Sequence, residues 1–441
     1  MAYQETKTTG YGTRVSNSLK GIGIGFLLLL GGTALLWWNE GRTVQITQML
    51  EEAQTVAVHV EDVSKPDPSL NGKLIHATAF TQTKDSLNDL TFGVGCVAIQ
   101  LERKVQYYQW VEHSETETKD KTGGSQETVT TYYYKQEWIG NPVNSQEFKD
   151  PDYQNKNFVL MDIENKSYMA ENVTFGAYKL PKDLIGSISG TVPMELSLSE
   201  ERLSEWNRDI KKSFESTSAS TVNNTAAVAG ETSTIAEGDS VKVETVATTE
   251  TGQIVKQDYN YVHVNGNVLY FGKNPNNPQV GDVSVTFTKI MPGDASVIAV
   301  VSGNNLQSYI AKNGKKLSVL TSGAVSMDEM FETEHLSNSI ISWVLRFIGL
   351  FLVVSGLKGI FGILVDLLRV LPFLADIVGL GVGLICKVLG LVWSLLVIAA
   401  AWLFYRPVTA GILLAVIVVL IAYLVKRGKN NKKAQVLNVQ M

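Results

Sequence analysis

The sequence predicts an integral membrane protein in which a four-span α-helical anchor holds one large, β-rich α+β domain outside the cytosol. Three observations support this fold class. Residues 339–425 are rich in apolar side chains, a shorter apolar run occupies residues 21–38, and the polar residues 39–338 lie between them. About twenty apolar residues of α-helix cross the hydrocarbon core of a bilayer. Both apolar regions are therefore long enough to anchor an end of the domain.

The N-terminal region is predicted to be a cytosolic segment, residues 1–20, followed by the first transmembrane helix, residues 21–38. The apolar run ends in Trp37-Trp38-Asn39-Glu40, whereas a cleaved signal peptide ends in small residues. We therefore expect a retained anchor. Basic residues close to a span favour the cytosolic side, and three precede this one, namely Lys7, Arg14 and Lys20.

The C-terminal region predicts three more spans, at about residues 340–357, 385–405 and 408–425. Residues 361–386 are interrupted by charges and by a proline, so we expect an interfacial segment there. The last sixteen residues, 426–441, form a basic tail. Basic residues at both ends predict two cytosolic termini, and an even number of spans follows.

Charged side chains near the spans have two possible explanations. Lys387 is either a boundary residue whose amine reaches the membrane surface or an intramembrane charge with a function. Arg346 lies one turn inside the second span and has the same two explanations. Asp366 and Arg369 are spaced for an ion pair on one face of a helix.

The middle domain is dominated by strand signals. Val283, Val285 and Phe287 alternate with polar residues, as expected for a half-buried strand. Asn265-Gly266-Asn267 separates two apolar runs and predicts a hairpin. Residues 213–252 are rich in Ser and Thr and poor in aromatic side chains, so we predict a flexible insertion.

Two helices are predicted within the domain. Leu203, Trp206 and Ile210 share one helical face, after a Ser197 to Glu200 spacing that is typical of a helix start. Ser326 and Glu329 repeat this spacing directly before the second span. We therefore expect a helix that couples the domain rigidly to the membrane.

Composition excludes several classes of site. A net charge of −5 gives no basic footprint for nucleic acid. Cys96 and Cys386 fall in different regions, so we expect no intrachain disulfide. The five histidines have no zinc-type spacing, and neither a phosphate-binding glycine loop nor a nucleophile elbow is present. We predict no catalytic residue, metal or cofactor.

An aromatic cluster is the candidate partner or ligand surface, formed by Tyr107, Tyr108, Trp110 and Trp138. These residues flank a polar, glycine-containing loop, which predicts a long hairpin with aromatic rings facing one another across its strands. Packing within the fold is the alternative explanation for the same pattern.

Glycines on the spans are the candidate helix-packing residues, because small residues let two helices approach closely. They fall into two groups, Gly21, Gly23 and Gly25 in the first span and Gly379, Gly381 and Gly383 in the membrane block.

The chain also resembles the transmembrane protein 43 (LUMA) family. The resemblance begins with Trp38-Asn39-Glu40-Gly41-Arg42 after the first span and continues in Arg103–Glu112, which contains Tyr107-Tyr108-Gln109-Trp110. It then follows Val280-Gly281-Asp282-Val283 and ends at Trp402-Leu403-x-Tyr405-Arg406-Pro407. Two departures are Ser284, where the family often has arginine, and Tyr108, which replaces a common methionine.

The resemblance implies four spans, a large lumenal or extracytoplasmic domain, and self-association. In animals it further implies a role in organising the endoplasmic reticulum and inner nuclear membrane, with emerin and lamins as partners. Bacterial relatives exist as well, so the bacterial cell membrane is the other expected location.

The function that we expect is a non-enzymatic, membrane-organising scaffold that self-associates and recruits membrane partners. The bilayer, further copies of the chain and other membrane proteins are its expected partners. A receptor or envelope-stress sensor for a small ligand, lipid or peptide is the alternative. A deep apolar pocket beside Trp110 and Trp138 would favour the receptor. A cleft that gathers Ser, His and acidic side chains would indicate a hydrolase.

Overall fold

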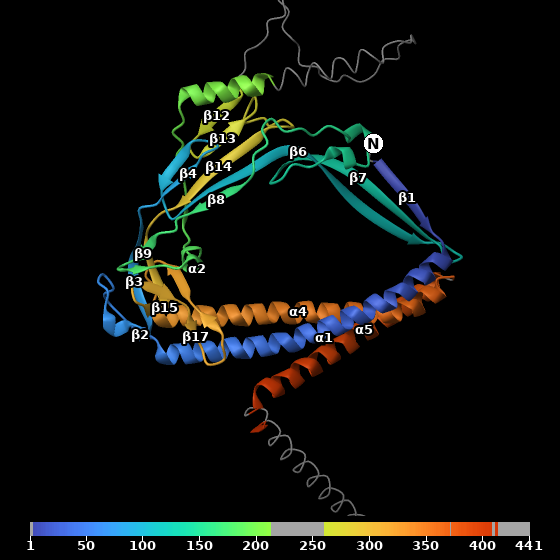
Figure 1. Ribbon diagram of the computed structural model, residues 1–441. Helices are drawn as coiled ribbons and strands as arrows, with labels where there is room; N and C mark the ends of the chain where they lie inside the picture. The colour runs from blue at the N-terminus through green and yellow to red at the C-terminus, as the bar shows by residue number, and fades with distance from the viewer. Residues whose placement is uncertain (1–2, 213–259, 371, 408–410, 413–441) are drawn as a thin grey trace, which may run out of the picture.

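The computed structural model describes residues 3–212, 260–370, 372–407 and 411–412. The predicted insertion 213–252 and the predicted tail 426–441 lie outside these residues, as does the predicted span 408–425 apart from residues 411–412. Within the described residues, three helices are long and apolar enough to cross a membrane. A β-rich domain lies on one side of them (Figure 1).

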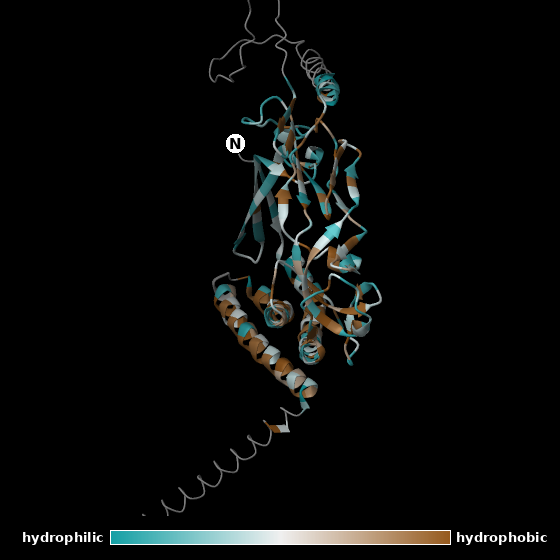
Figure 2. Cartoon of the chain, turned by 90° about the vertical axis from the view of Figure 1, so that its left-hand side faces the viewer, coloured by the Kyte–Doolittle hydropathy of each residue, from teal (hydrophilic) through white to brown (hydrophobic). Residues whose placement is uncertain are grey.

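The three long helices form the base of the molecule: α1 (Tyr11–Val56), α4 (Met327–Leu368) and α5 (Pro372–Tyr405). Ser326 caps α4 by accepting a hydrogen bond from the Glu329 backbone N–H, so the predicted helix start is confirmed. The helix then continues without a break from the domain into its apolar part. Brown, hydrophobic helices lie beneath a mixed domain in Figure 2.

Two predicted boundaries differ from the structure. The expected first span 21–38 is the middle of a 46-residue helix, because no helix-breaking residue follows Trp38. The expected interfacial segment 361–386 is divided between the end of α4 and the start of α5, with the chain turning at residues 369–370. Pro372 opens α5, a position where a missing backbone N–H is tolerated.

Two sheets and two short strand pairs build the domain among the described residues. The first sheet has the order β1 (Tyr3–Thr9), β7 (Gln126–Ile139), β6 (Gln100–Asp120), β14 (Val283–Ile290), β13 (Val268–Phe271) and β12 (Val262–Asn265), with β11 (Thr191–Pro193) beside β14 and β8 (Lys166–Met169) beside β6.

The second sheet has the order β19 (Val319–Ser322), β15 (Asp294–Ser302), β16 (Asn305–Gln307), β10 (Tyr178–Lys179), β9 (Val173–Phe175), β3 (Leu74–Thr83) and β2 (Val58–His59), and β15 also pairs with β3. The short pairs are β17 (Tyr309–Ile310) with β18 (Lys316–Leu317) and β4 (Ser86–Asp89) with β5 (Val94–Val97). The short helices are α2 (Lys182–Ile185), η1 (Pro68–Leu70), η2 (Ser145–Glu147) and η3 (Pro151–Tyr153).

The strand predictions hold where the local pattern is strong. Val283, Val285 and Phe287 are fully buried on β14, and β12 and β13 form the expected hairpin with Gly266 at a φ of 59° in its turn.

The predicted helix around Trp206 is also present. Residues 200–212 are helical, and Trp206 and Ile210 are buried. Ser199, rather than the predicted Ser197, caps this helix by accepting from the Arg202 N–H.

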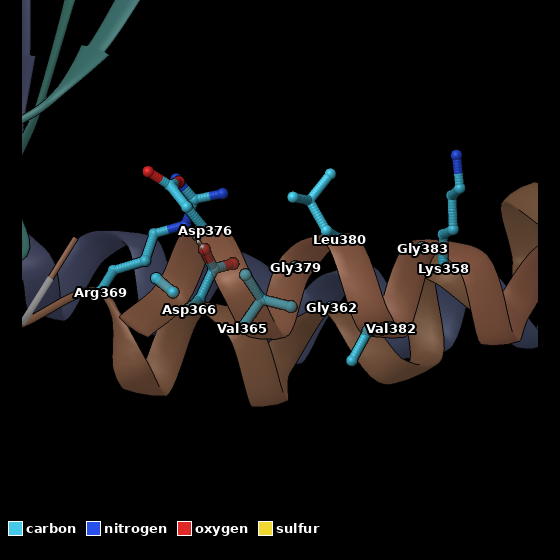
Figure 3. A pocket seen from close by; sticks show the side chains of 11 residues that line it. Lys358, Gly362, Val365, Asp366, Arg369, Asp376, Gly379, Leu380, Val382 and Gly383 are labelled. Carbon is cyan, nitrogen blue, oxygen red and sulfur yellow. Dashed lines mark ion pairs between the residues drawn. The ribbon is translucent and has the colours of Figure 1, made fainter. Parts of the chain in front are cut away.

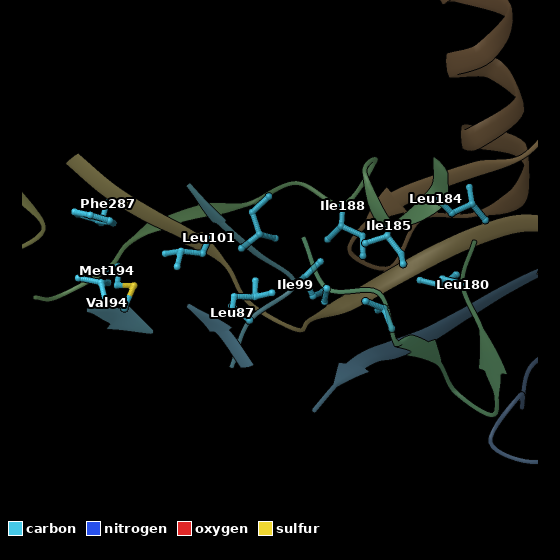
Figure 4. Close-up of a cluster of buried hydrophobic side chains, with 14 of the residues drawn as sticks. Leu87, Val94, Ile99, Leu101, Leu180, Leu184, Ile185, Ile188, Met194 and Phe287 are labelled. Carbon is cyan, nitrogen blue, oxygen red and sulfur yellow. The ribbon is translucent and has the colours of Figure 1, made fainter. Parts of the chain in front are cut away.

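One continuous apolar core joins the two sheets. Figure 4 shows part of it, where side chains from β4, β5 and β6 meet those that follow β10 and those of β14. A second cluster joins the domain to the membrane helices, since Leu50 and Ala53 of α1 and Phe331 of α4 pack against Ile298 of β15. The helices and the domain therefore share buried surface.

The hairpin of β6 and β7 is the longest feature of the domain. Fourteen residue pairs join the two strands, from Tyr107–Ile139 to Asp120–Gln126. The N-terminal strand β1 lies beside β7 over seven pairs. Residues 3–9, predicted to be separated from the domain by a span, are thus part of the domain's sheet.

Candidate functional site

The four predicted aromatic residues lie on β6 and β7 but have different surroundings. Tyr107 is 2% exposed, and its hydroxyl donates to the Ile163 carbonyl while accepting from the Ile163 N–H at 3.0 Å. Burial raises the pKa of the Tyr107 phenol. Tyr107 is therefore a core residue and is not part of any partner surface.

Tyr108 and Trp138 form the predicted cross-strand pair, with ring centroids 5.2 Å apart. Trp138 also meets Tyr270 of β13 edge-on at 6.2 Å. Trp138 and Tyr270 line a pocket of about 420 Å³ whose other walls include His263 and Asn276. This pocket combines two aromatic rings with polar groups.

Trp110 belongs to a separate aromatic stack. Its ring meets Tyr153 edge-on at 5.0 Å, and Tyr153 stacks on Tyr134 at 4.1 Å. Tyr134 donates to Glu112 at 2.7 Å, and burial with this carboxylate raises the pKa of the Tyr134 phenol. The stack fixes the loop after β7 against the hairpin, so Trp110 and Trp138 do not share one pocket.

Asp282 is a buried carboxylate beneath the Trp138 pocket. It is 1% exposed, and it accepts from the Tyr270 hydroxyl at 2.5 Å and the Gln279 N–H at 2.8 Å. Burial raises the pKa of the Asp282 carboxyl, although both hydrogen bonds act to lower it. The sequence signal for this group is an acidic residue directly before an alternating apolar strand.

Glycines build the contact between α1 and α4, as small-residue faces do in membrane helices. An added Cβ on Gly25 would lie 2.7 Å from the Gly356 carbonyl oxygen, and one on Gly32 would lie 2.9 Å from that of Gly349. A Cβ on Gly359 would lie 3.1 Å from the Cα of Gly25. Backbone therefore meets backbone along this face.

The six predicted packing glycines are placed unequally. Gly25 is inside the α1–α4 contact, and Gly21 is at its margin, where an added Cβ would lie 3.9 Å from the Gly359 oxygen. A Cβ on Gly379 would lie 3.3 Å from the Val365 side chain. At the remaining three positions, an added Cβ would have no heavy atom of the described residues within 4 Å. These positions are Gly23, Gly381 and Gly383.

Polar side chains fix the register of the α1–α4 pair. Arg346 donates two hydrogen bonds to the Glu40 carboxylate at 2.7 and 2.8 Å, and Asn39 donates to the Ser342 carbonyl at 3.1 Å. Glu40 is 1% exposed. Arg346 thus pairs with a carboxylate. Its sequence position predicted a boundary residue or a functional intramembrane charge, and neither of these included an acidic partner. Lys387, in contrast, has an exposed side chain.

A charged cluster lies where the hairpin tip meets the helix ends. Arg14 donates to Asp120 at 2.5 Å and to Asp366 at 3.5 Å, and Arg369 forms ion pairs with Asp120 and Asp366. The predicted Asp366–Arg369 pair is confirmed. Ser18 donates to Asp366 as well.

A groove of about 620 Å³ opens beside this cluster, between α4 and α5. Figure 3 shows Arg369, Asp366 and Asp376 at one end and Lys358 at the other, with Leu380 between them. The arrangement presents both signs of charge beside an apolar wall.

The described residues contain no group of three His, Cys, Asp or Glu side chains placed to hold a metal ion. Cys96 and Cys386, both described, are free thiols. What the described groups can do chemically is pair charges, stack rings and pack helices.

Comparison with known proteins places the chain in a family. The family model for Transmembrane protein 43 matches residues 107–407. Transmembrane protein 43 of Rattus norvegicus is 28% identical over 94% of this chain and 92% of its own length, and the Homo sapiens protein is 27% identical over the same shares. The Drosophila melanogaster homolog is 27% identical over 88% of this chain and 90% of its own. No solved structure gives a significant match. The chain is a membrane protein that belongs to the transmembrane protein 43 family.

Proposed function

We propose that this chain is a non-enzymatic scaffold that organises a patch of membrane, by self-association and by recruiting other membrane proteins. Its expected location is a bacterial cell membrane or, in a eukaryote, the endoplasmic reticulum and inner nuclear membrane, with the domain outside the cytosol. Emerin- or lamin-type partners are expected only in the eukaryotic case.

The observation that carries this proposal is the rigid connection between the domain and the helix pair. Leu50 and Phe331 share one buried cluster with Ile298 of the domain, and the Glu40–Arg346 ion pair locks the two helices together. A domain held this firmly keeps a fixed orientation on the membrane. Fixed orientation is what a repeating assembly requires of each copy.

The helix layer also offers surface to further copies. Leu27, Phe351 and Leu380 are each at least 70% exposed on α1, α4 and α5. At three glycines of α1 and α5, an added Cβ would meet no heavy atom of the described residues within 4 Å, and small residues permit close approach of a second helix. The proposed contact positions between copies are therefore Gly23, Gly381 and Gly383.

A receptor remains the second candidate because of the pocket at Trp138. Its polar lining and two rings suit a small polar ligand with an apolar face. Trp110, the other residue expected there, packs against Tyr153. Most of the lining residues are polar, whereas the receptor prediction requires a deep apolar pocket, so we rank this function below the scaffold.

The experiment that tests the scaffold is the mass of the particle extracted in a mild detergent. We expect a large, homogeneous homo-oligomer whose mass falls when Gly23, Gly381 and Gly383 are all replaced by leucine. The variant should still fold, because an added Cβ at these positions has no heavy atom of the described residues within 4 Å. A monomer with a tightly bound small molecule would favour the receptor instead.

A further inference from the structure

We propose that the pocket at Trp138 binds a unit of an uncharged saccharide, which stacks on the tryptophan ring and forms hydrogen bonds with the amide and hydroxyl side chains around it. A site of this kind gives the receptor candidate a ligand class. It does not depend on self-association, so glycan binding and particle mass are separate tests.

The floor of the pocket is a row of neighbouring residues on four strands. His263 on β12 pairs with Tyr270 on β13. Tyr270 also pairs with Ser284 on β14, and Ser284 pairs in turn with Gln106 on β6. Directly paired residues point to the same face of a sheet. The next residue along β14, Val285, is fully buried in the core, so the row lies on the outer face.

Trp138 forms the aromatic wall of the pocket. Its ring is held by two neighbours, Tyr108 at a centroid distance of 5.2 Å and Tyr270 at 6.2 Å. The Trp138 side chain is half-buried and lines the pocket. The face of an aromatic ring carries partial negative charge, which attracts the positively polarised C–H groups of a sugar ring. Trp138 is thus a fixed platform for stacking.

A hydrogen-bonded loop forms the rim of the pocket. Asn276 lies in a turn in which the Asn277 N–H donates to the Asn274 carbonyl at 3.0 Å, and its own N–H donates to the Asn274 side chain at 3.0 Å. The Tyr270 hydroxyl lies 3.2 Å from the Asn274 carbonyl oxygen and donates to the buried Asp282 carboxylate at 2.5 Å. These bonds hold Asn276 at the pocket before a ligand binds, which lowers the entropic cost of binding.

The polar side chains of the pocket are available to a ligand. Four of them form no side-chain hydrogen bond with another described residue, and these are Gln106, Asn265, Asn276 and Ser284. Amides and hydroxyls can each donate and accept, as the hydroxyls of a sugar do. The His263 Nε2 donates to the Gly272 carbonyl at 3.1 Å, which leaves Nδ1 of the neutral ring as a further acceptor.

The charge of the lining selects among ligand classes. Among the described residues, the pocket is lined by no Asp, Glu, Lys or Arg side chain. A charged ligand would therefore lose water without gaining an ion partner, and a wholly apolar ligand would leave the amides unpaired. A sugar unit meets both conditions, because it has hydroxyls at its edge and C–H groups on its faces. The cavity of about 420 Å³ has the usual size of a small-molecule site.

The position of the pocket leaves two sources for the sugar. The strands β12, β13 and β14 lie in the half of the domain away from α1 and α4 (Figure 1). A free oligosaccharide or a glycan attached to a protein could therefore supply the same unit. A peptide fits less well, because the pocket presents side chains on a sheet face rather than the free backbone groups of a strand edge.

The test is glycan binding by the full chain, purified in a detergent without a sugar headgroup because a glycoside detergent would compete. An array of neutral and charged oligosaccharides identifies the glycan, and titration calorimetry measures its affinity. We expect a neutral glycan to bind. Asn276→Ala should weaken its affinity about three- to tenfold, and Trp138→Ala about tenfold or more. Asn277→Ala is the matched control and should leave the affinity unchanged, since the exposed Asn277 side chain does not line the pocket.

Three results would overturn the proposal: no glycan bound by the wild-type chain, binding of charged glycans alone, or an affinity that survives both Asn276→Ala and Trp138→Ala. Thermal unfolding identifies variants that fold, and Asn276→Ala, on an exposed loop, tests the site even if Trp138→Ala does not fold.

A glycopeptide and the same peptide without its sugar separate the sources. Tighter binding of the glycopeptide than of the free sugar would support a protein-linked glycan, and equal binding would support a free saccharide. Equal binding of the bare peptide would replace the proposal with a peptide site.

Discussion

At the residue scale, the domain contains a buried ion pair whose two charges satisfy each other. The pair is Arg103 with Asp89. The Arg103 guanidinium donates to both oxygens of Asp89 at 2.8 and 2.7 Å and to the Glu164 carbonyl at 3.0 Å. Asp89 is completely buried and also accepts from the Thr91 N–H. The pair therefore joins β4, β6 and the segment before β8.

Arg103→Met should destabilise the domain by about 3–5 kcal/mol, because it leaves the Asp89 carboxylate buried without its partner. Chemical denaturation of the purified protein measures this change. Adding Asp89→Leu should recover much of the loss. Lys182→Met is the matched control, since its pair with Glu171 is exposed on both sides and should change stability by less than about 1 kcal/mol. Equal effects of the two single variants would contradict the prediction.

A histidine pair makes a second residue-scale prediction. His76 is 2% exposed, its ring lies 2.9 Å from that of His59 between their Nδ1 atoms, and its Nε2 donates to the Val325 carbonyl. Burial lowers the pKa of His76.

With a lowered pKa in the folded state, His76 binds a proton more readily in the unfolded chain than in the folded one. The free energy of unfolding should therefore have its full value above the ordinary histidine pKa of about 6.5 and decrease as the pH falls below it. The measurement is the thermal midpoint at about pH 7.5 and about pH 5.5, on either side of that value. His76→Gln, which keeps a donor for Val325, should show a smaller decrease. Identical pH slopes in both proteins would assign the acid sensitivity to other groups.

At the scale of elements, the helix pair is held by backbone contact rather than by large side chains. Gly25, Gly32, Gly349 and Gly356 leave no room for a Cβ on either helix. Close approach of this kind increases dispersion contacts over the whole length of the pair.

Gly25→Leu should therefore separate α1 from α4 and lower stability by at least about 1–3 kcal/mol, the usual effect of overpacking. Gly31→Leu is the matched control on the same helix, where an added Cβ meets no described atom within 4 Å. Thermal unfolding in detergent compares them. An effect at Gly25 no larger than that at Gly31 would show that the α1–α4 contact is not the one described.

At the scale of the whole molecule, the hairpin tip connects the far end of the helix layer to the domain. Asp120 is the shared acceptor there, since it pairs with both Arg14 and Arg369. The hairpin tip, β1 and the helix ends should therefore unfold locally as one cooperative unit.

Asp120→Asn should accelerate amide exchange of residues 3–9 by about tenfold or more, as hydrogen bonds to charged groups contribute about 1.5–3 kcal/mol. Exchange in β14 should not change. Hydrogen–deuterium exchange with mass spectrometry measures both, and Lys119→Asn, on an exposed side chain, is the control. Unaltered exchange of residues 3–9 would show that the cluster does not hold the N-terminal strand.

The sequence alone determined the features that depend on neighbouring residues. The apolar helical segments within α1, α4 and α5, the alternation of Val283 to Phe287, the turn at Gly266 and the cap at Ser326 all follow from short-range geometry and periodicity. The family followed from motifs spread along the chain.

Only the tertiary structure decided which of these features meet. Arg14 and Asp120 are 106 positions apart, and Glu40 and Arg346 are 306 apart. The sequence placed Gly23 and Gly25 in one group, but only Gly25 contacts α4. Such choices depend on which faces of distant elements pack together, and local periodicity contains no information about the identity of the partner.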